Sequence, residues 1–268
     1  MGERELPAEL QASSNLEEVV RDADVVVMAV PSQGFREVLR EAAPLVRPWV
    51  PIVSLTKGLE RDSGKRMTEV VADELSGHPA AVLTGPNLAK EIMDGQPAAS
   101  VVAIDDDVIA RELQRIFSNP RLLVYTNPDV VGCEVGGVVK NVIAICAGMA
   151  AGMGFGDNTR ATIITRGLAE MARLGVALGG RPLTFAGLAG MGDLIATCSS
   201  QQSRNTQVGQ ALGRGEKIED VLAAMTMVAE GVKSARTVYE LAMRHGVDMP
   251  ITEEVAAVCH DGVAARDA

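Results

Sequence analysis

The sequence has few aromatic residues: Phe, Trp and Tyr together make up 3% of its 268 residues. The hydrophobic fraction is nevertheless 47% and the mean hydropathy is +0.15, which excludes an intrinsically disordered or collagen-like chain. The core must therefore be built from Val, Ala, Leu, Ile and Met, a composition that suits helices packed on a parallel β-sheet. A chain of this length has room for two domains, each with its own core.

Clustered cysteines and a basic surface are also missing. The four cysteines (Cys133, Cys146, Cys198 and Cys259) are far apart and include no CxxC pair, which argues against a zinc site or a disulfide framework, so we expect no metal. The 25 Lys and Arg are outnumbered by 35 Asp and Glu, giving a net charge of −10. Because proteins that bind nucleic acids need a basic face, we expect no nucleic-acid partner.

No targeting signal is visible in the sequence. The first ten residues, MGERELPAEL, are polar and lack the apolar segment of a signal peptide. The longest apolar stretch, residues 142–156, is too short and too rich in glycine to span a bilayer. We therefore expect a cytoplasmic protein with no membrane partner.

Strand and helix patterns alternate over the first half of the chain. Apolar runs predict strands at residues 25–30, 51–55, 80–83, 100–104 and 122–125. Helical patterns lie between them, and a short helix to residue 21 is predicted from a capping box at residues 14–17. Strands separated by helices indicate βαβ units and a parallel sheet.

After residue 128 the strand patterns stop, and helical periodicity continues to the end of the chain. The candidate helices cover residues 130–153, 159–178, 205–212, 218–225, 231–245 and 252–260. We therefore predict that the chain divides near residues 127–128 into an α/β domain and an all-helical domain.

One motif that this architecture normally carries is missing. An α/β dinucleotide-binding domain opens with a strand, a GxGxxG turn and a helix, but no GxGxxG follows any predicted strand here. Either the fold never contained this unit, or the chain starts downstream of it. The motifs described below favour the second explanation. The prediction is thus an α/β fold with an incomplete, N-terminally truncated Rossmann-like parallel-sheet domain that binds the dinucleotide (residues 1–127), followed by a helical substrate-binding domain (residues 128–268).

Polar or glycine-bearing loops follow three predicted strands, at residues 31–34, 56–58 and 84–87. Ligands of an open parallel sheet bind at these carboxyl ends. Proline and glycine occur in the turns of any α/β fold, so these loops need no functional explanation. For the first loop, a turn and a functional site explain the residues equally well. Lys57 is different, because a lysine directly after a buried strand and beside a glycine is well placed for an anionic ligand.

Lys140 is the most specific candidate for a catalytic residue, because it stands in an otherwise apolar helical run, residues 138–144. A lysine in such a run either extends to solvent, which is the commoner outcome, or serves chemistry. Asn141 beside it is also polar, and two adjacent polar residues suggest that the helix lines a cleft. Burial would lower the pKa of Lys140 toward the range that is useful for proton transfer.

Two further segments suit a small anionic substrate but also have ordinary explanations. Asp193 follows a glycine-rich segment and, taken alone, is best explained as a cap of the next helix. Ser203, Arg204 and Asn205 precede a helical stretch, where a hydroxyl, a guanidinium and backbone N–H groups suit a phosphate. An N-cap with a surface arginine explains these three residues about equally well. The residues alone thus indicate a small anionic substrate between the domains, but no specific reaction.

Taken in order, the motifs resemble those of the bacterial-type NAD(P)-dependent glycerol-3-phosphate dehydrogenases. The matching segments are VPS (30–32), SLTKGLE (54–60), GPNLAKE (85–91), EVGGVVKN (134–141), GLAGMGDL (187–194), SRN (203–205) and EG (230–231). Each segment is modestly specific, but all of them in the same order over nearly the whole chain are very specific.

The resemblance implies an oxidoreductase that transfers a hydride reversibly between the cofactor, NAD or NADP, and C2 of dihydroxyacetone phosphate. The product, sn-glycerol 3-phosphate, would supply phospholipid synthesis. Lys140 would be the general acid–base at the C2 oxygen, and Lys57 would polarise the carbonyl. The implied substrate contacts are Lys57, Gly85, Asn87, Asn141, Asp193, Thr197, Ser203, Arg204 and Asn205. The implied cofactor contacts are Ala89, Arg204, Val228 and Glu230.

Two departures from the family pattern leave alternatives open. Many family members have Ser or Thr followed by Phe where Asn87 and Leu88 stand here. Without GxGxxG, the pyrophosphate cradle and the residue that distinguishes NAD from NADP are both missing. The alternatives are a non-catalytic, phosphate-binding remnant and a different hydroxyacid dehydrogenase of similar layout. A homodimer is included as a hypothesis.

Overall fold

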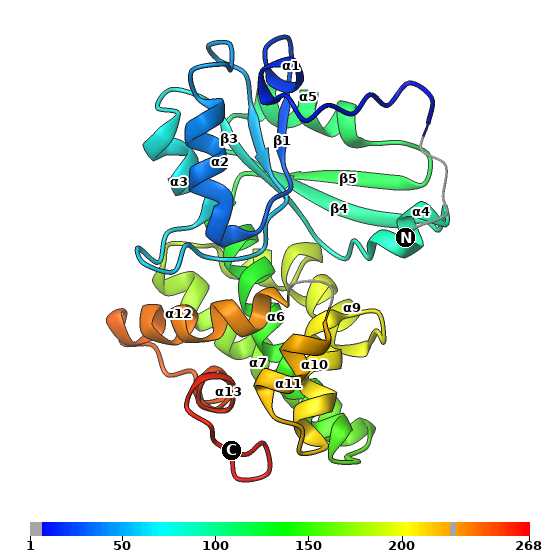
Figure 1. Cartoon of the computed structure of the whole chain (residues 1–268), viewed down its shortest axis with the longest axis vertical. Helices are drawn as coiled ribbons and strands as arrows, with labels where there is room; N and C mark the ends of the chain where they lie inside the picture. Colours follow the sequence, from blue (N-terminus) through cyan, green and yellow to red (C-terminus); the bar gives the residue numbers. More distant parts are fainter. Residues whose placement is uncertain (1–6, 226–228) are drawn as a thin grey trace.

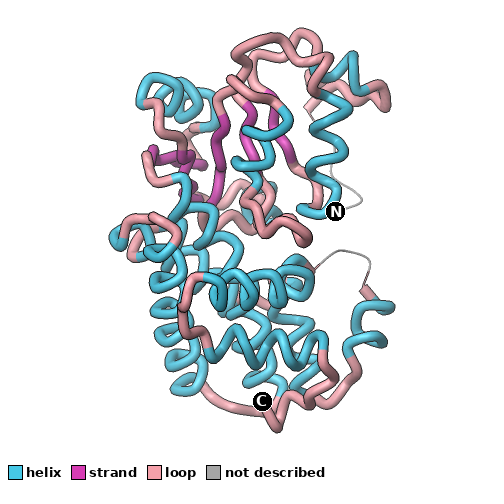
Figure 2. The backbone as a smooth tube through the Cα atoms, turned by 90° about the vertical axis from the view of Figure 1, so that its left-hand side faces the viewer, coloured by secondary structure: helices cyan, strands magenta, loops and turns pink. Residues whose placement is uncertain are grey.

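The computed structural model describes residues 7–225 and 229–268 of the chain. A β-sheet flanked by helices forms the upper half of the molecule, and a bundle of helices forms the lower half (Figure 1). Seen from the side, all strands lie in the upper half (Figure 2). The predicted fold class, a Rossmann-like α/β part followed by a helical part, is confirmed.

The sheet has five strands in the order β1-β2-β3-β4-β5. They are β1 (Val26–Met28), β2 (Ile52–Ser54), β3 (Ala80–Thr84), β4 (Ala98–Ala103) and β5 (Leu122–Asn127). β1, β2 and β3 are parallel, whereas β4 runs antiparallel to β3 and parallel to β5. The reversal has a local cause: the connection between β3 and β4 contains only the five-residue helix α4 (Ala89–Met93), while a parallel crossover needs an element long enough to return along the sheet.

Helices cover both faces of the sheet. They are α1 (Leu16–Val20), the 3₁₀ turn η1 (Ser32–Gly34), α2 (Phe35–Ala42), α3 (Met67–Glu74) and α5 (Asp107–Phe117). α2 and α3 bury Phe35 and Met67 against Ile52 of β2. On the opposite face, Leu113 of α5 packs with Val53 of β2. Neighbouring residues of one strand thus face different layers, as the continuous apolar runs predict.

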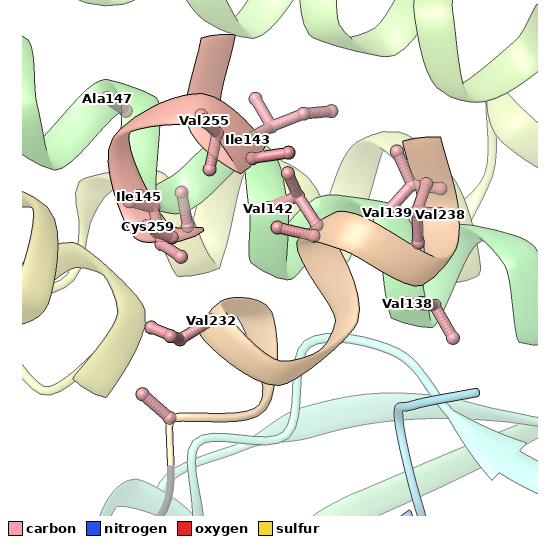
Figure 3. Close-up of a cluster of buried hydrophobic side chains, with 14 of the residues drawn as sticks. Val138, Val139, Val142, Ile143, Ile145, Ala147, Val232, Val238, Val255 and Cys259 are labelled. Carbon is pink, nitrogen blue, oxygen red and sulfur yellow. The ribbon is translucent and has the colours of Figure 1, made fainter. Parts of the chain in front are cut away.

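The helical part is built around α6. Its elements are α6 (Val130–Gly152), α7 (Asp157–Ala177), α8 (Pro182–Phe185), the π-helical turn η2 (Leu188–Gly192), α9 (Asp193–Ser199), α10 (Arg204–Gly213), α11 (Ile218–Ala224), α12 (Glu230–Arg244) and α13 (Pro250–His260). Figure 3 shows apolar side chains of α6 gathered with those of α12 and α13, among them Val142, Val238 and Val255. By length and composition α6 passes for a membrane span, but 83% of its apolar window is buried inside the protein. Its hydropathy is that of a core helix.

The strand reversal determines where α6 begins. Asn127, the end of β5, is aligned with Ala103 of β4, which is aligned with Val82 in the middle of β3, and the chain then continues toward the start of β3. α6 therefore starts at the edge where β1–β3 begin, and Cys133 packs on Val82 of β3. One turn further, Gly137 lies against Thr84, the last residue of β3. This route brings the middle of α6 to the carboxyl ends of the parallel strands.

α6 and α10 cross at backbone contact through two pairs of glycines (Gly148 and Gly152 on α6, Gly209 and Gly213 on α10). A Cβ at Gly209 would overlap the carbonyl oxygen of Ile145, and a Cβ at Gly148 would overlap that of Thr206. Any side chain larger than hydrogen would push the helices apart. The glycines thus hold the start of α10 close to the middle of α6.

The first half of the outer edge of β5 is occupied by the chain itself. The side chain of Gln114 donates to the carbonyl oxygen of Val124 at 2.6 Å, and the Val124 N–H donates to the Ser118 hydroxyl at 3.2 Å. Leu122 exchanges backbone hydrogen bonds with Asn119 in the turn before the strand. The outward-facing backbone groups of Leu122 and Val124 therefore already have partners.

Candidate active site

Two lysines share one buried carboxylate at the junction of the sheet and the helices. Lys57, in the loop after β2, lies with its Nζ 2.6 Å from Asp193 Oδ2. Lys140, in α6, lies with its Nζ 2.9 Å from Asp193 Oδ1. The side chains of Asp193, Lys140 and Lys57 are 3%, 9% and 19% exposed, so Lys140 does not extend to solvent. Three residues from separate segments of the sequence thus form one charged cluster.

Burial and charge tune the protonation of this cluster. Burial lowers the pKa of Lys140 to about 8, and the positive charge of Lys57 acts in the same direction. Burial alone would raise the pKa of Asp193, but the two ammonium groups outweigh it and hold that pKa below its usual value. Asp193 is therefore ionised at neutral pH, while Lys140 can gain or lose a proton near physiological pH.

Lys57 also contacts the loop that follows β3. Its Nζ donates to the carbonyl oxygen of Gly85 at 2.9 Å and to Asn87 Oδ1 at 3.1 Å. Asn87, the position that departs from the family pattern, is thus a direct partner of Lys57. The Lys57 ammonium thus has three acceptors. A substrate oxygen can accept a hydrogen bond from it by replacing one of these three.

Thr197, one turn after Asp193 in α9, completes the surroundings of Lys140. The Lys140 ammonium donates to Thr197 Oγ1 at 2.7 Å. The Thr197 hydroxyl lies 3.2 Å from Asp193 Oδ1, and its carbonyl oxygen accepts from Thr206 of α10 at 2.9 Å. Lys140 is therefore held on two sides by α9, whose position is tied to α10.

Asn141 and Asn205 connect four elements through their side-chain amides. Asn141 Nδ2 donates to the carbonyl oxygen of Lys57 at 3.2 Å, and its Oδ1 accepts from Asn205 Nδ2 at 2.9 Å. Asn205 Oδ1 accepts from the Gly231 N–H at the start of α12 at 3.0 Å. The two amides thus fix the Lys57 loop, α6, α10 and α12 relative to one another. Direct contact of these side chains with a substrate stays a prediction.

The residues predicted to bind phosphate form the start of α10. Ser203 is the N-cap, and its hydroxyl accepts from the Thr206 N–H at 3.2 Å. Arg204, the first residue of the helix, is exposed, whereas Asn205 is buried. The ordinary capping explanation of Ser203 is correct, but it does not exclude phosphate binding, because the capped turn presents the positive end of the helix dipole.

The cofactor residues implied by the resemblance lie around the same junction or outside the described part of the chain. Ala89 is the exposed first residue of α4, and Val228 lies outside the described residues. Glu230, the first residue of α12, accepts from the hydroxyl of Ser32 at 2.8 Å. A Cβ at Gly58 would lie 2.5 Å from that hydroxyl. Local sequence patterns assign no role to Ser32, although it is part of the matching VPS segment.

The outer side of the Lys57 loop is braced by η1 and α2. The guanidinium of Arg36 binds both carboxylate oxygens of Glu60, at 2.6 and 2.9 Å. Gln33 donates to the carbonyl oxygen of Leu59 at 3.0 Å. Because the loop is fixed on both sides, the backbone of Lys57 is positioned before any ligand binds.

Comparison with known proteins gives consistent results. The family model described as "NAD-dependent glycerol-3-phosphate dehydrogenase N-terminus" matches residues 1–110, and the corresponding C-terminus model matches residues 129–268. The "Glycerol-3-phosphate dehydrogenase [NAD(P)+] 2" of Sphingopyxis alaskensis is 61% identical over 262 residues, which are 98% of this chain and 79% of the relative. The "Glycerol-3-phosphate dehydrogenase [NAD(P)+]" of Streptomyces coelicolor is 54% identical over 260 residues, which are 96% of this chain and 77% of the relative. Among solved structures, glycerol-3-phosphate dehydrogenase from Coxiella burnetii matches with a TM-score of 0.94 at 37% identity, covering 97% of this chain and 80% of that one.

Proposed function

Because the chain belongs to the NAD-dependent glycerol-3-phosphate dehydrogenase family, we propose that the cluster around Asp193 performs the family's reaction. The protein is an oxidoreductase that interconverts dihydroxyacetone phosphate and sn-glycerol 3-phosphate with NAD(H) or NADP(H). The relatives support this function and not that of a non-catalytic remnant. The observation that carries the proposal is one ionised carboxylate shared by two lysines, of which the more deeply buried has its pKa lowered to about 8.

Lys140 is the proton donor in this proposal. A nicotinamide cofactor would supply or accept the hydride at C2 when bound. The ketone oxygen then needs one proton as the alcohol forms. Lys140 gives this proton from Nζ during reduction, and its neutral amine takes it back during oxidation. A pKa of about 8 allows both directions near physiological pH.

Lys57 and Asp193 assist the same oxygen. The Lys57 side chain lies beside the carbonyl and stabilises the negative charge that develops on the oxygen. Asp193 holds both ammonium groups at its two oxygens, at 2.6 and 2.9 Å, so that they approach one substrate atom from two sides. Thr197 then fixes the direction of the Lys140 side chain.

The substrate phosphate binds at the start of α10 in this proposal. Arg204 supplies a guanidinium that matches phosphate oxygens, and the first turn of the helix supplies backbone N–H groups and the positive end of the dipole. The hydrogen bond between Thr206 of α10 and Thr197 of α9 connects this turn to Lys140. A three-carbon substrate would extend from the first turn of α10, which holds its phosphate, to Lys140, which lies at its C2 oxygen.

The residues present fit the nicotinamide end of the cofactor. A carboxamide has both a donor and an acceptor, and the hydroxyl of Ser32 and the carboxylate of Glu230 offer the complementary groups beside Gly58. Ala89 and Asn87 follow β3 at the same edge of the sheet, where dinucleotides bind in open α/β folds. The 268 residues contain no GxGxxG, so no residue of the chain is assigned to the pyrophosphate.

These assignments give the two predicted domains different functions. Residues 1–127 would bind the dinucleotide and residues 128–268 the phosphorylated substrate, with Lys57 and Lys140 contributed from the two sides. A cytoplasmic location, a homodimer and the lack of a membrane or nucleic-acid partner stay predictions.

The direct test is a steady-state assay of the purified chain with dihydroxyacetone phosphate and NADH or NADPH, followed at the nicotinamide absorbance. Dihydroxyacetone and 2-oxo acids serve as comparison substrates, and the phosphorylated ketone should be preferred by orders of magnitude. A folded chain that oxidises neither cofactor in the presence of dihydroxyacetone phosphate would refute the proposed function.

Replacing Arg204 by alanine should raise KM for dihydroxyacetone phosphate about 10- to 100-fold, because one charge-assisted bond to the phosphate is lost. kcat should change much less. Arg214 at the other end of α10, exposed and paired with Glu216, provides the matched control. If Arg214→Ala and Arg204→Ala give the same KM, Arg204 does not bind the substrate.

The two directions of the reaction should depend oppositely on pH. Reduction needs the protonated amine of Lys140, so kcat/KM for dihydroxyacetone phosphate should be constant below pH 8 and fall above it. Oxidation needs the neutral amine, so kcat/KM for sn-glycerol 3-phosphate should rise up to about pH 8 and then level off. Initial rates from pH 6 to 10 in both directions test this. Parallel profiles in the two directions would contradict the assignment of Lys140.

A further inference from the structure

Glu134 is a second buried carboxylate that joins the two halves of the molecule. It lies in α6, and its side chain is 3% exposed. Its Oε1 accepts from the Thr68 N–H at 3.0 Å, and its Oε2 accepts from the Thr68 hydroxyl at 2.5 Å and from Arg66 Nη1 at 2.8 Å. Both partners belong to the start of α3, in the α/β part of the chain. The reaction described above does not use this group.

The contacts of α6 with the α/β part follow one stripe of the helix. Glu134, Gly137 and Asn141 are spaced i, i+3 and i+7, and such residues lie on one face of a helix. Glu134 binds the start of α3, a Cβ at Gly137 would lie 3.5 Å from Cγ of Lys57, and Asn141 donates to the carbonyl oxygen of Lys57 at 3.2 Å. The stripe therefore runs along the connection between β2 and α3.

This connection carries Lys57 near its beginning and Arg66 at its end, so α6 holds it at both ends. Lys140 is also in α6, directly before Asn141. The separation of the two lysines is thus fixed by two contacts besides Asp193: the amide of Asn141 near the site and the carboxylate of Glu134 about two helical turns away.

We propose that Glu134 is a positioning residue that holds α6 on the β2–α3 connection and thereby places Lys57 and Lys140 on one substrate oxygen. The inference rests on the proposed function, because it assigns a purpose to the distance between the two lysines. Glu134 touches neither the substrate nor the reacting atoms. Its loss lets α6 shift relative to the connection, and a shift of about 1 Å in a catalytic pair lowers turnover up to about 100-fold.

The chain provides a matched control in Glu170. This carboxylate of α7 is also buried, and it also accepts bonds from a helix start: from Ile251 N at 2.7 Å, Thr252 N at 3.2 Å and the Thr252 hydroxyl at 3.0 Å. Burial raises the pKa of both Glu134 and Glu170. Glu170 connects two helices of the bundle, whereas Glu134 connects the bundle to the α/β part and also pairs with Arg66.

The experiment compares Glu134→Gln with Glu170→Gln in the full chain. Both should unfold at lower urea concentrations than the wild type. Under conditions where both are folded, Glu134→Gln should lower kcat about 10- to 100-fold with KM for dihydroxyacetone phosphate within about threefold, because Arg204 and α10 lie on one side of the junction. Glu170→Gln should keep kcat within about threefold of the wild type.

A readout that does not use the cofactor accompanies the kinetics. With ε-¹³C-labelled lysine, the pH titration of the Lys140 carbon reports its protonation in the free protein. In Glu134→Gln the pKa of Lys140 should rise from about 8 as its surroundings loosen, and in Glu170→Gln it should not move. Equal kcat and equal Lys140 titration in the two variants would overturn the proposal.

Thr68→Val provides a milder variant in case Glu134→Gln does not fold. It removes one donor to Glu134 at nearly constant volume, and it should lower kcat in the same direction with KM unchanged. An unchanged kcat in Thr68→Val, together with an unfolded Glu134→Gln, would show that the contact serves folding alone and would reject the inference. A wild-type chain without dihydroxyacetone phosphate reductase activity would instead reject the proposed function, while the Lys140 titration would still decide the role of Glu134.

Discussion

Replacing Lys140 by alanine should lower kcat for dihydroxyacetone phosphate reduction by about 10²- to 10⁴-fold, the range lost when a general acid is removed. KM should change no more than about threefold, because the phosphate contacts at α10 remain. The variant should fold, since alanine removes a buried charge and favours the helix. Initial rates at saturating cofactor, with circular dichroism as a folding check, measure the effect.

Two further variants show whether the loss reports proton transfer. Lys217, an exposed lysine at the start of α11, is the control, and Lys217→Ala should behave like the wild type. Small primary amines added to Lys140→Ala should restore part of the turnover, most at a pH where the amine is protonated. Turnover of Lys140→Ala within threefold of the wild type would remove this residue from the chemistry.

Replacing Gly209 by alanine should give the largest loss of stability among single-methyl additions at the α6–α10 crossing. The new Cβ would overlap the carbonyl oxygen of Ile145, and backbone atoms of two long helices cannot move aside as a side-chain end can. Overpacking of this kind costs about 1–3 kcal/mol, and more where backbone must shift. The better helix propensity of alanine returns only about 1 kcal/mol, so a net decrease in the free energy of unfolding is expected.

Urea denaturation followed by circular dichroism measures this decrease. Gly34 is the control, because a Cβ there meets nothing within 4 Å and its φ is −103°. Gly34→Ala should leave the denaturation midpoint nearly unchanged. Since the crossing also fixes the start of α10, KM for dihydroxyacetone phosphate should rise in Gly209→Ala. A Gly209→Ala protein as stable as Gly34→Ala would mean that the two helices do not meet at backbone contact.

The part of the site that local sequence patterns predict is Lys140. A charged residue in an apolar helical run stands out without any knowledge of the fold, and the helix predicted over residues 130–153 agrees closely with α6 (Val130–Gly152). Asp193 could not be found in this way. Its local pattern indicates a helix cap, and its function as a shared counterion arises only when three segments far apart in the sequence meet.

Other features of the structure depend on packing that no local pattern records. The predicted strands were found in the right places, but the reversal between β3 and β4 depends on how a short connection closes. Glu134 lies two turns before Asn141 in the same helix as Lys140, and its polar character is explained only by the start of α3 on the other side of the junction. Ser32 likewise acquires a partner, Glu230, from the far end of the chain.

The hydrogen bonds that occupy the outer edge of β5 at Leu122 and Val124 have a consequence for aggregation at high protein concentration. A fibril or a strand-swapped aggregate grows by adding chains to free main-chain groups at a sheet border. Here Gln114, Ser118 and Asn119 would first have to release Val124 and Leu122. Templated growth on these two residues therefore requires partial unfolding of the end of α5 and the following turn.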